Sequence, residues 1–103
     1  MPFGVMGGQY QPVGQSHVLT NMLDYGCDVQ EAIDMPRGLH YENIFQLEDG
    51  VPAEIVEGLK KLGHNTTSVV GPLGGGQAIW IDDKTGNLVG GSEPRKDGLA
   101  LGY

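Results

Sequence analysis

The sequence predicts an α+β fold with a largely antiparallel sheet and two or three helices on one side of it. Three observations lead to this prediction. Short β-rich segments alternate with segments of helical periodicity, the helical segments carry recognisable start and stop signals, and the last two β-rich segments flank a glycine-containing turn. The length of 103 residues supports one domain at most.

The chain begins with a predicted strand over residues 1–8 that runs into the pair Gly7–Gly8. This strand starts abruptly, and we expect it to pair with a strand that would cover it. After a loop over residues 9–15, Ser16 is placed to cap a helix that Gly26 ends. The apolar residues at helical spacing in it are Val18, Leu19, Met22 and Leu23.

A second, short helix is predicted from Asp28 onward. Asp28 and Glu31 have the spacing of a capping box, in which each side chain accepts a hydrogen bond from the other residue's backbone N–H. Pro36 stops the helix because the residue before a proline disfavours helical backbone angles. Its buried face is expected to consist of Val29, Ala32 and Ile33.

The middle of the chain predicts two extended pieces and a third helix. The extended pieces lie within residues 39–48, and their apolar pattern slips near Asn43, which indicates a bend or a bulge. Pro52 suits the first turn of a helix over residues 53–62, which Gly63 ends. The apolar stripe expected to be buried on this helix is Ile55, Val56, Leu59 and Leu62.

The last third of the chain predicts a β-hairpin. Residues 65–70 are β-rich, and residues 71–76 form a glycine-rich loop. Strands over residues 77–82 and 88–92 then flank a turn over residues 83–87.

Charge and composition exclude several classes of protein. Six basic and thirteen acidic residues give a net charge of −7, so the chain lacks the cations that bind a phosphate backbone, and no nucleic acid partner is expected. No apolar run approaches the roughly 18 residues of a membrane span. The single cysteine, Cys27, excludes an intrachain disulfide and a cysteine-rich metal site.

Few polar residues have the spacing of a catalytic or metal site. His17, His40 and His64 are far apart in sequence, so neither a metal nor another cofactor is expected. The carboxylate pairs Glu48–Asp49 and Asp82–Asp83 border turns and are interpreted as solvated. An arginine directly after a helix-stopping proline, Arg37, is held close to the backbone and could pair with a carboxylate inside the domain, although a structural role is favoured.

Glycine is the compositional outlier, with 18 residues, and it forms three clusters. None has the spacing of a nucleotide-binding loop. For residues 74–76 and 90–91 we favour close packing of strands. For Gly7 and Gly8, successive amides at a strand end are also suited to bind an anionic oxygen, which is what an oxyanion hole requires.

Five segments, in order, resemble one known family. They are residues 3–8, residues 25–32 with Tyr25-Gly26 and Asp28-Val29, Pro36-Arg37, residues 76–79, and residues 91–103 with the terminal Gly102-Tyr103. Together they closely resemble the C-terminal part of γ-glutamyltranspeptidases. The resemblance implies a single partial domain over residues 1–103, which is the C-terminal portion of an N-terminal-nucleophile hydrolase with a four-layer αββα sandwich.

The resemblance also implies a mechanism. A threonine, exposed when a precursor cleaves itself, attacks a γ-glutamyl amide and forms an acyl-enzyme, and the family's oxyanion-hole glycines match Gly7 and Gly8 here. None of the chain's threonines stands in the nucleophile's matching position, so this chain alone is expected to be inactive. No substrate-binding residue is assigned. Residues 9–12 depart from familiar members, which leaves the donor, including other amides, open.

Two hypotheses about partners follow. In the first, the chain works with the remainder of a γ-glutamyltranspeptidase, its large subunit and the N-terminal part of its small subunit, on a γ-glutamyl small molecule. In the second, it is a stand-alone, non-catalytic domain that associates with itself or another chain through an open sheet face.

Overall fold

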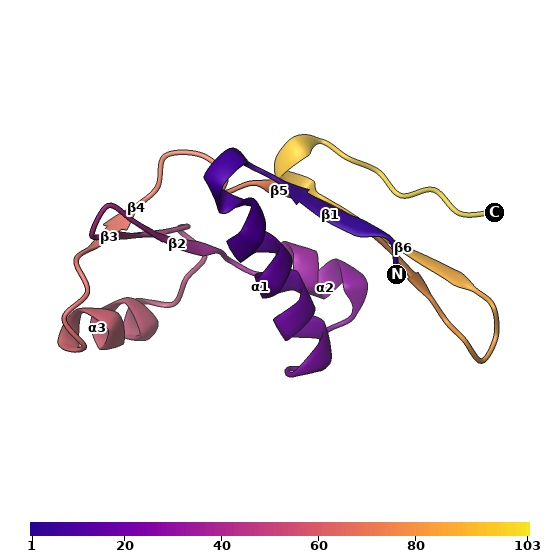
Figure 1. Cartoon of the computed structure of the whole chain (residues 1–103), viewed down its shortest axis with the longest axis horizontal. Helices are drawn as coiled ribbons and strands as arrows, with labels where there is room; N and C mark the ends of the chain where they lie inside the picture. Colours follow the sequence, from indigo (N-terminus) through magenta and orange to yellow (C-terminus); the bar gives the residue numbers. More distant parts are fainter. The chain divides into compact units, whose positions relative to one another are not determined.

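The computed structural model describes residues 1–103, which form two compact units. The first unit comprises Met1–Met35 and Gly74–Tyr103, and the second comprises Pro36–Leu73. The first contains β1 (Phe3–Met6), α1 (Gln11–Leu23), α2 (Val29–Asp34), β5 (Gly75–Ile81) and β6 (Leu88–Ser92), and the second contains β2 (Gly38–Tyr41), β3 (Ile44–Leu47), α3 (Ala53–Lys61) and β4 (Thr66–Ser68) (Figure 1).

The predicted α+β class is confirmed, with three α-helices and mainly antiparallel strands. The strands form two three-stranded sheets, one in each unit, where a single sheet was expected. The assignment of residues 1–103 to one partial domain stays a prediction. No helix has the length and apolarity needed to cross a membrane.

The sheet of the first unit has the order β1-β5-β6 and is antiparallel throughout. Helices α1 and α2 lie on one face of this sheet (Figure 1). The register places Val5 opposite Gly76 and Ala78 opposite Gly91, and the small residues let the helices approach. A side chain at Gly91 would contact Ile33 and Val29 of α2 at 3.0–3.1 Å, so the predicted close packing there is confirmed.

The opposite face of this sheet carries the C-terminal segment and several exposed apolar side chains. Gly98 lies against Ser92 and Gln77, and Ala100 lies against Gly90. Around this segment the face is open, and the exposed fractions are 57% for Met6, 43% for Ile79, 42% for Ile81 and 68% for Leu88. We call these four residues the open face.

Helix α1 begins earlier than the sequence predicted. Ser16 was expected to cap it, but the helix starts at Gln11 and the Ser16 hydroxyl donates to the Pro12 carbonyl within it at 2.9 Å. A 3₁₀ turn over Gly8–Tyr10 leads directly into the helix, and Pro12 suits its first turn. The helix ends at Leu23, and Gly26 follows with a φ of 72°.

Helix α2 agrees closely with its prediction. The Glu31 N–H donates to Asp28 Oδ1 and the Asp28 N–H donates to Glu31 Oε2, both at 2.8 Å, so the capping box is complete. The buried residues are the predicted Val29, Ala32 and Ile33.

The second unit is a hairpin, a helix and a parallel strand. The slip near Asn43 is a two-residue turn, in which Glu42 and Asn43 have φ values of 49° and 63°, joining β2 to β3. Strand β4 pairs in parallel with β3, which needs the crossover through α3. The predicted burial of the stripe on α3 is wrong, because none of its four residues is buried: Ile55 is 52% exposed, Leu62 is 79% exposed, and Val56 and Leu59 are half-buried.

The predicted β5–β6 hairpin is confirmed. Asp82 organises its turn: Oδ1 accepts the Lys84 N–H at 2.9 Å and Oδ2 accepts the Thr85 hydroxyl at 2.6 Å. These hydrogen bonds, the one from Thr85 foremost, lower the pKa of Asp82 from 3.8. The interpretation of this carboxylate as an exposed turn residue holds.

Candidate functional site

Gly7 and Gly8 form the turn between β1 and the 3₁₀ turn that begins α1. Gly7 has φ 134° and Gly8 has φ 58°, values that L side chains rarely adopt. Their carbonyls take part in the turn, since the Gly7 oxygen accepts the Tyr10 N–H at 3.0 Å and the Gly8 oxygen accepts the Gln11 N–H. Neither the Gly7 nor the Gly8 N–H donates a hydrogen bond within the chain.

The two glycines are required for different reasons. A Cβ on Gly7 would lie 2.9 Å from the Gly74 Cα, and a Cβ on Gly74 would lie 2.5 Å from the Met6 carbonyl oxygen. Gly7 and Gly74 therefore let two backbone segments touch beside the buried ring of Tyr10. At Gly8 no atom lies within 4 Å of the position a Cβ would take, so close packing does not explain the glycine. Its positive φ and its free amide are the two features that favour glycine at this position.

An ion pair between Glu93 and Arg95, which was not among the predicted functional residues, stabilises the same unit. Glu93 is fully buried and accepts the Gly76 N–H at 2.7 Å and Arg95 Nη1 at 2.8 Å. Arg95 also donates to the carbonyls of Ile33 and Met35, each at 3.0 Å. The pair connects β5, the end of β6 and the C-terminal end of α2. The sequence feature that could have indicated it is a glutamate directly before Pro-Arg at the end of a predicted strand.

Arg37 and Glu48 hold the two ends of the second unit together. Arg37 is fully buried, its N–H donates to Glu48 Oε2 at 2.9 Å, and its Nη1 donates to the Leu73 carbonyl at 2.9 Å. Glu48 Oε1 accepts the Leu73 N–H at 3.0 Å. The prediction that Glu48 is a solvated turn carboxylate is therefore wrong, because it holds backbone N–H groups from both ends of the unit.

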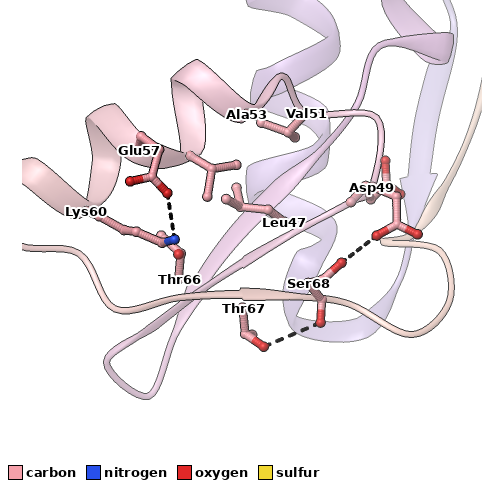
Figure 2. Close-up of a pocket in the computed structure, with 11 residues that line it drawn as sticks. Leu47, Asp49, Val51, Ala53, Glu57, Lys60, Thr66, Thr67 and Ser68 are labelled. Carbon is pink, nitrogen blue, oxygen red and sulfur yellow. Dashed lines mark hydrogen bonds and ion pairs between the residues drawn. The ribbon is translucent and has the colours of Figure 1, made fainter.

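A groove of about 510 Å³ lies in the second unit beside α3, β3 and β4 (Figure 2). Two pairs of its polar side chains bond to each other: Lys60 pairs with Glu57 at 2.8 Å, and Ser68 donates to Asp49. The apolar part of its lining consists of Leu47, Val51, Ala53 and Val56.

The chain's threonines are dispersed over several elements. The threonines lie in α1 (Thr20), in β4 (Thr66 and Thr67) and in the β5–β6 turn (Thr85). No group of three or more histidine, cysteine, aspartate or glutamate side chains is arranged to hold a metal ion. The Cys27 thiol is free and half-buried.

The comparison with family models matches the whole chain. Residues 1–103 match the model described as gamma-glutamyltranspeptidase. Among curated proteins, the chain is 39% identical over 110 residues to the glutathione hydrolase-like YwrD proenzyme of Bacillus subtilis, and 31% identical over 112 residues to the oxamate amidohydrolase proenzyme of Klebsiella pneumoniae. These alignments cover 97% and 100% of this chain and 21% of each relative, so the chain spans about a fifth of their length.

Solved structures agree in fold. The cephalosporin acylase from Bacillus halodurans matches with a TM-score of 0.91 and 42% identity, over 99% of this chain and 20% of that chain. The γ-glutamyltranspeptidase from Pseudomonas nitroreducens matches with a TM-score of 0.86 and 23% identity, over 98% of this chain and 54% of that chain, which supports the fold alone. With its full length matched by the family model, the chain belongs to the γ-glutamyltranspeptidase family.

Proposed function

We propose that this chain is the C-terminal part of a longer γ-glutamyltransferase or glutathione hydrolase, and that it supplies the oxyanion hole. The observation that carries the proposal is the pair of amides at Gly7 and Gly8, which donate no hydrogen bond within the chain and lie in a turn that only glycine adopts easily. Family membership supplies the reaction class.

The proposed reaction is acyl transfer in two steps. A threonine outside residues 1–103 attacks the carbonyl carbon of the γ-glutamyl amide, and its hydroxyl proton passes through a base to the departing amine as the C–N bond breaks. Water or an acceptor amine then attacks the resulting ester and releases the threonine. Both steps place negative charge on the carbonyl oxygen, which two backbone N–H groups stabilise.

The local fold supports binding of that charge. The carbonyls of Gly7 and Gly8 accept hydrogen bonds at the start of the helical segment, whereas their amides donate none within the chain. The N-terminal end of a helix also carries a partial positive charge. The proposed oxyanion would therefore benefit from the two amides and from the helix end that they precede.

The names of the relatives support an amide donor. The B. subtilis protein is called glutathione hydrolase-like, the K. pneumoniae protein an oxamate amidohydrolase, and the B. halodurans structure a cephalosporin acylase. The first two names describe hydrolysis, the second of an amide, and the third describes an acylase. We propose a γ-glutamyl amide as the donor for the longer protein that contains this chain.

Trapping of the acyl-enzyme tests this proposal. The complete protein should be mixed with γ-glutamyl-p-nitroanilide, quenched in acid and mapped by peptide mass spectrometry. We expect a γ-glutamyl adduct on one threonine outside residues 1–103. An adduct on any other residue type, or turnover with no adduct under rapid quenching, would contradict the proposed mechanism.

A second candidate function is a non-catalytic domain that associates through a sheet face. The observation that favours it is the open face, on which four apolar side chains are between 42% and 68% exposed. Under this alternative, the complete protein shows no amide hydrolysis and the adduct experiment gives unmodified peptides.

A further inference from the structure

Three aromatic rings meet on the hairpin side of the second unit. The ring centres of His40 and His64 are 6.0 Å apart, and both rings contact Phe45, with centres at 6.0 Å and 5.3 Å from it. The two histidines are 24 residues apart in sequence, which is why sequence spacing gave no sign of their contact.

The backbone brings these residues together. His40 of β2 is directly opposite Phe45 of β3, so their side chains lie on the same face of the sheet. The Phe45 N–H donates to the Asn65 carbonyl at 2.7 Å, which brings His64 beside the same ring. The His64 N–H in turn donates to the Leu59 carbonyl at 3.0 Å and ties this residue to the end of α3.

The two rings also keep their nitrogens available. Neither the His40 nor the His64 ring forms a hydrogen bond within the chain. His17 differs, because its Nε2 lies 3.1 Å from the side-chain amide nitrogen of Asn21. His40 is exposed and His64 is partly exposed, so a solute can reach both.

The separation is close to that of two imidazoles on one metal ion. Because zinc is tetrahedral, a metal–nitrogen bond to histidine is about 2.0–2.1 Å long and a ring nitrogen lies about 1.1 Å from its ring centre, two imidazoles on one zinc ion have centres about 5.1 Å apart. The observed 6.0 Å exceeds this distance by about 0.9 Å. Rotation of the exposed His40 side chain and the partly exposed His64 side chain can close this difference and bring one nitrogen of each ring to the same ion.

We propose that His40 and His64 form a two-histidine site for a divalent transition-metal ion, with water completing its coordination. Imidazole is a ligand for zinc, copper and nickel, and the general order of affinities places Cu²⁺ above Zn²⁺. No third protein ligand is grouped with the pair, so the site is an open one that exchanges its ion. A bound ion would connect β2 to the segment between α3 and β4.

Calorimetric titration of the 103-residue chain with Zn²⁺ tests the site. We expect one ion per chain, with His40→Ala and His64→Ala each weakening binding at least about tenfold, the scale on which loss of a metal-site residue acts. His17→Ala is the matched control, because it removes a histidine from the other unit, and it should bind as the parent does. Cu²⁺ should bind more tightly than Zn²⁺, with the same pattern across variants.

A further measurement separates coordination from packing. His40→Gln and His64→Gln keep a polar side chain of similar size, and they should retain the fold by amide NMR spectra while losing Zn²⁺-induced shifts of Phe45. Equal affinity in the parent and the His40→Gln/His64→Gln double variant, or equal losses with His17→Ala, would overturn the proposal.

Discussion

At the scale of single residues, the stability and the proposed chemistry of the first unit depend on a few backbone N–H groups and on the hydrogen-bond acceptors that they meet. The Gly76 N–H is satisfied by a buried carboxylate, Glu93, whose charge is balanced by Arg95. The amides of Gly7 and Gly8 are left without a partner in the chain. The first arrangement stabilises the fold, and the second is what we propose the longer protein uses for chemistry.

We expect Glu93→Ala to destabilise the chain by about 3–5 kcal/mol, because it removes one partner of a buried ion pair and leaves the Gly76 N–H unsatisfied. Urea denaturation followed by circular dichroism measures this change. Glu54→Ala, which removes an exposed carboxylate of α3, is the control and should change stability by no more than about 0.5 kcal/mol. Similarly small changes in stability for both variants would show that the Glu93–Arg95 pair contributes little to the stability of the chain.

The sequence was informative at residues whose role is local and uninformative where distant segments meet. Gly7 and Gly8 could be singled out because a glycine pair at a strand end is unusual in itself. Glu93 was not predicted because its backbone partner, Gly76, lies in β5 and its burial depends on tertiary packing. His40 and His64 were judged by sequence spacing, although the register of β2 and β3 decides their proximity.

At the scale of elements, helix start and stop signals predicted the helix boundary correctly where a single signal was present. The capping box of α2 was predicted correctly, because Asp28 and Glu31 lie three residues apart and need nothing else. The predicted start of α1 was too late because Pro12 and Ser16 both resemble helix start signals. The turn after Gly7 leads directly into a helix that has Pro12 in its first turn. The burial of the α3 stripe was overestimated because a periodic pattern does not say whether anything covers it.

Loss of the α2 cap should cost about 1 kcal/mol. Asp28→Ala removes the acceptor of the Glu31 N–H, and N-cap replacements typically have this effect. Thermal denaturation of the chain measures it. Asp24→Ala, at the C-terminal end of α1, is the matched control and should be neutral or slightly stabilising, since a negative charge is unfavourable there. A destabilisation by Asp24→Ala as large as that by Asp28→Ala would contradict the capping role.

The β5–β6 turn should lose stability in acid. Hydrogen bonds lower the pKa of Asp82 below 3.8, so the stabilising charged form is fully present above pH 3.8 and is lost as pH falls through the lowered pKa. Hydrogen exchange of the Gly86 N–H, which donates to the Asp82 carbonyl, should therefore accelerate in that range. Asp82→Asn should remove this dependence and Asp83→Asn should retain it; a pH-independent parent would refute the role of Asp82.

At the scale of the whole molecule, two sheets in two units replace the single sheet expected from the sequence. The strand lengths and turns were readable locally, but pairing depends on which edges meet, and a three-residue parallel strand such as β4 has no local signature of its partner. The open face of the first sheet also belongs to the scale of the whole molecule, because the strand sequences do not determine whether another segment packs on that face.

The open face leads us to expect that the isolated chain self-associates. Sedimentation equilibrium should show an average mass that rises with concentration, and Leu88→Lys should shift the chain toward monomer. Leu62→Lys is the control, because Leu62 is similarly exposed but lies after α3 in the second unit. A concentration-independent monomer, or equal effects of the two lysine variants, would show that the open face does not mediate association.

The isolated chain should also release no p-nitroaniline from γ-glutamyl-p-nitroanilide. The proposed oxyanion hole stabilises a transition state that only forms once a nucleophile attacks, and the nucleophile is assigned outside residues 1–103. Absorbance at high protein concentration measures the release. Turnover that persists at constant specific activity through successive purification steps would contradict this assignment.

The central claim is that the Gly8 amide stabilises the oxyanion, and the most direct measurement is kcat of the complete protein with Gly8→Val beside Gly26→Val. Both glycines have positive φ, 58° and 72°, with no atom near the position a Cβ would take, so both substitutions impose similar backbone strain. Valine keeps the backbone N–H but disfavours the φ of 58° that directs it, so the donor is displaced rather than removed. We expect Gly8→Val to lower kcat by about 10²–10³-fold, the scale on which an oxyanion-hole donor acts, and Gly26→Val to leave the kcat of the folded protein unchanged. If folded Gly8→Val protein turns over donor at close to the parent rate, the oxyanion role of this glycine pair is wrong.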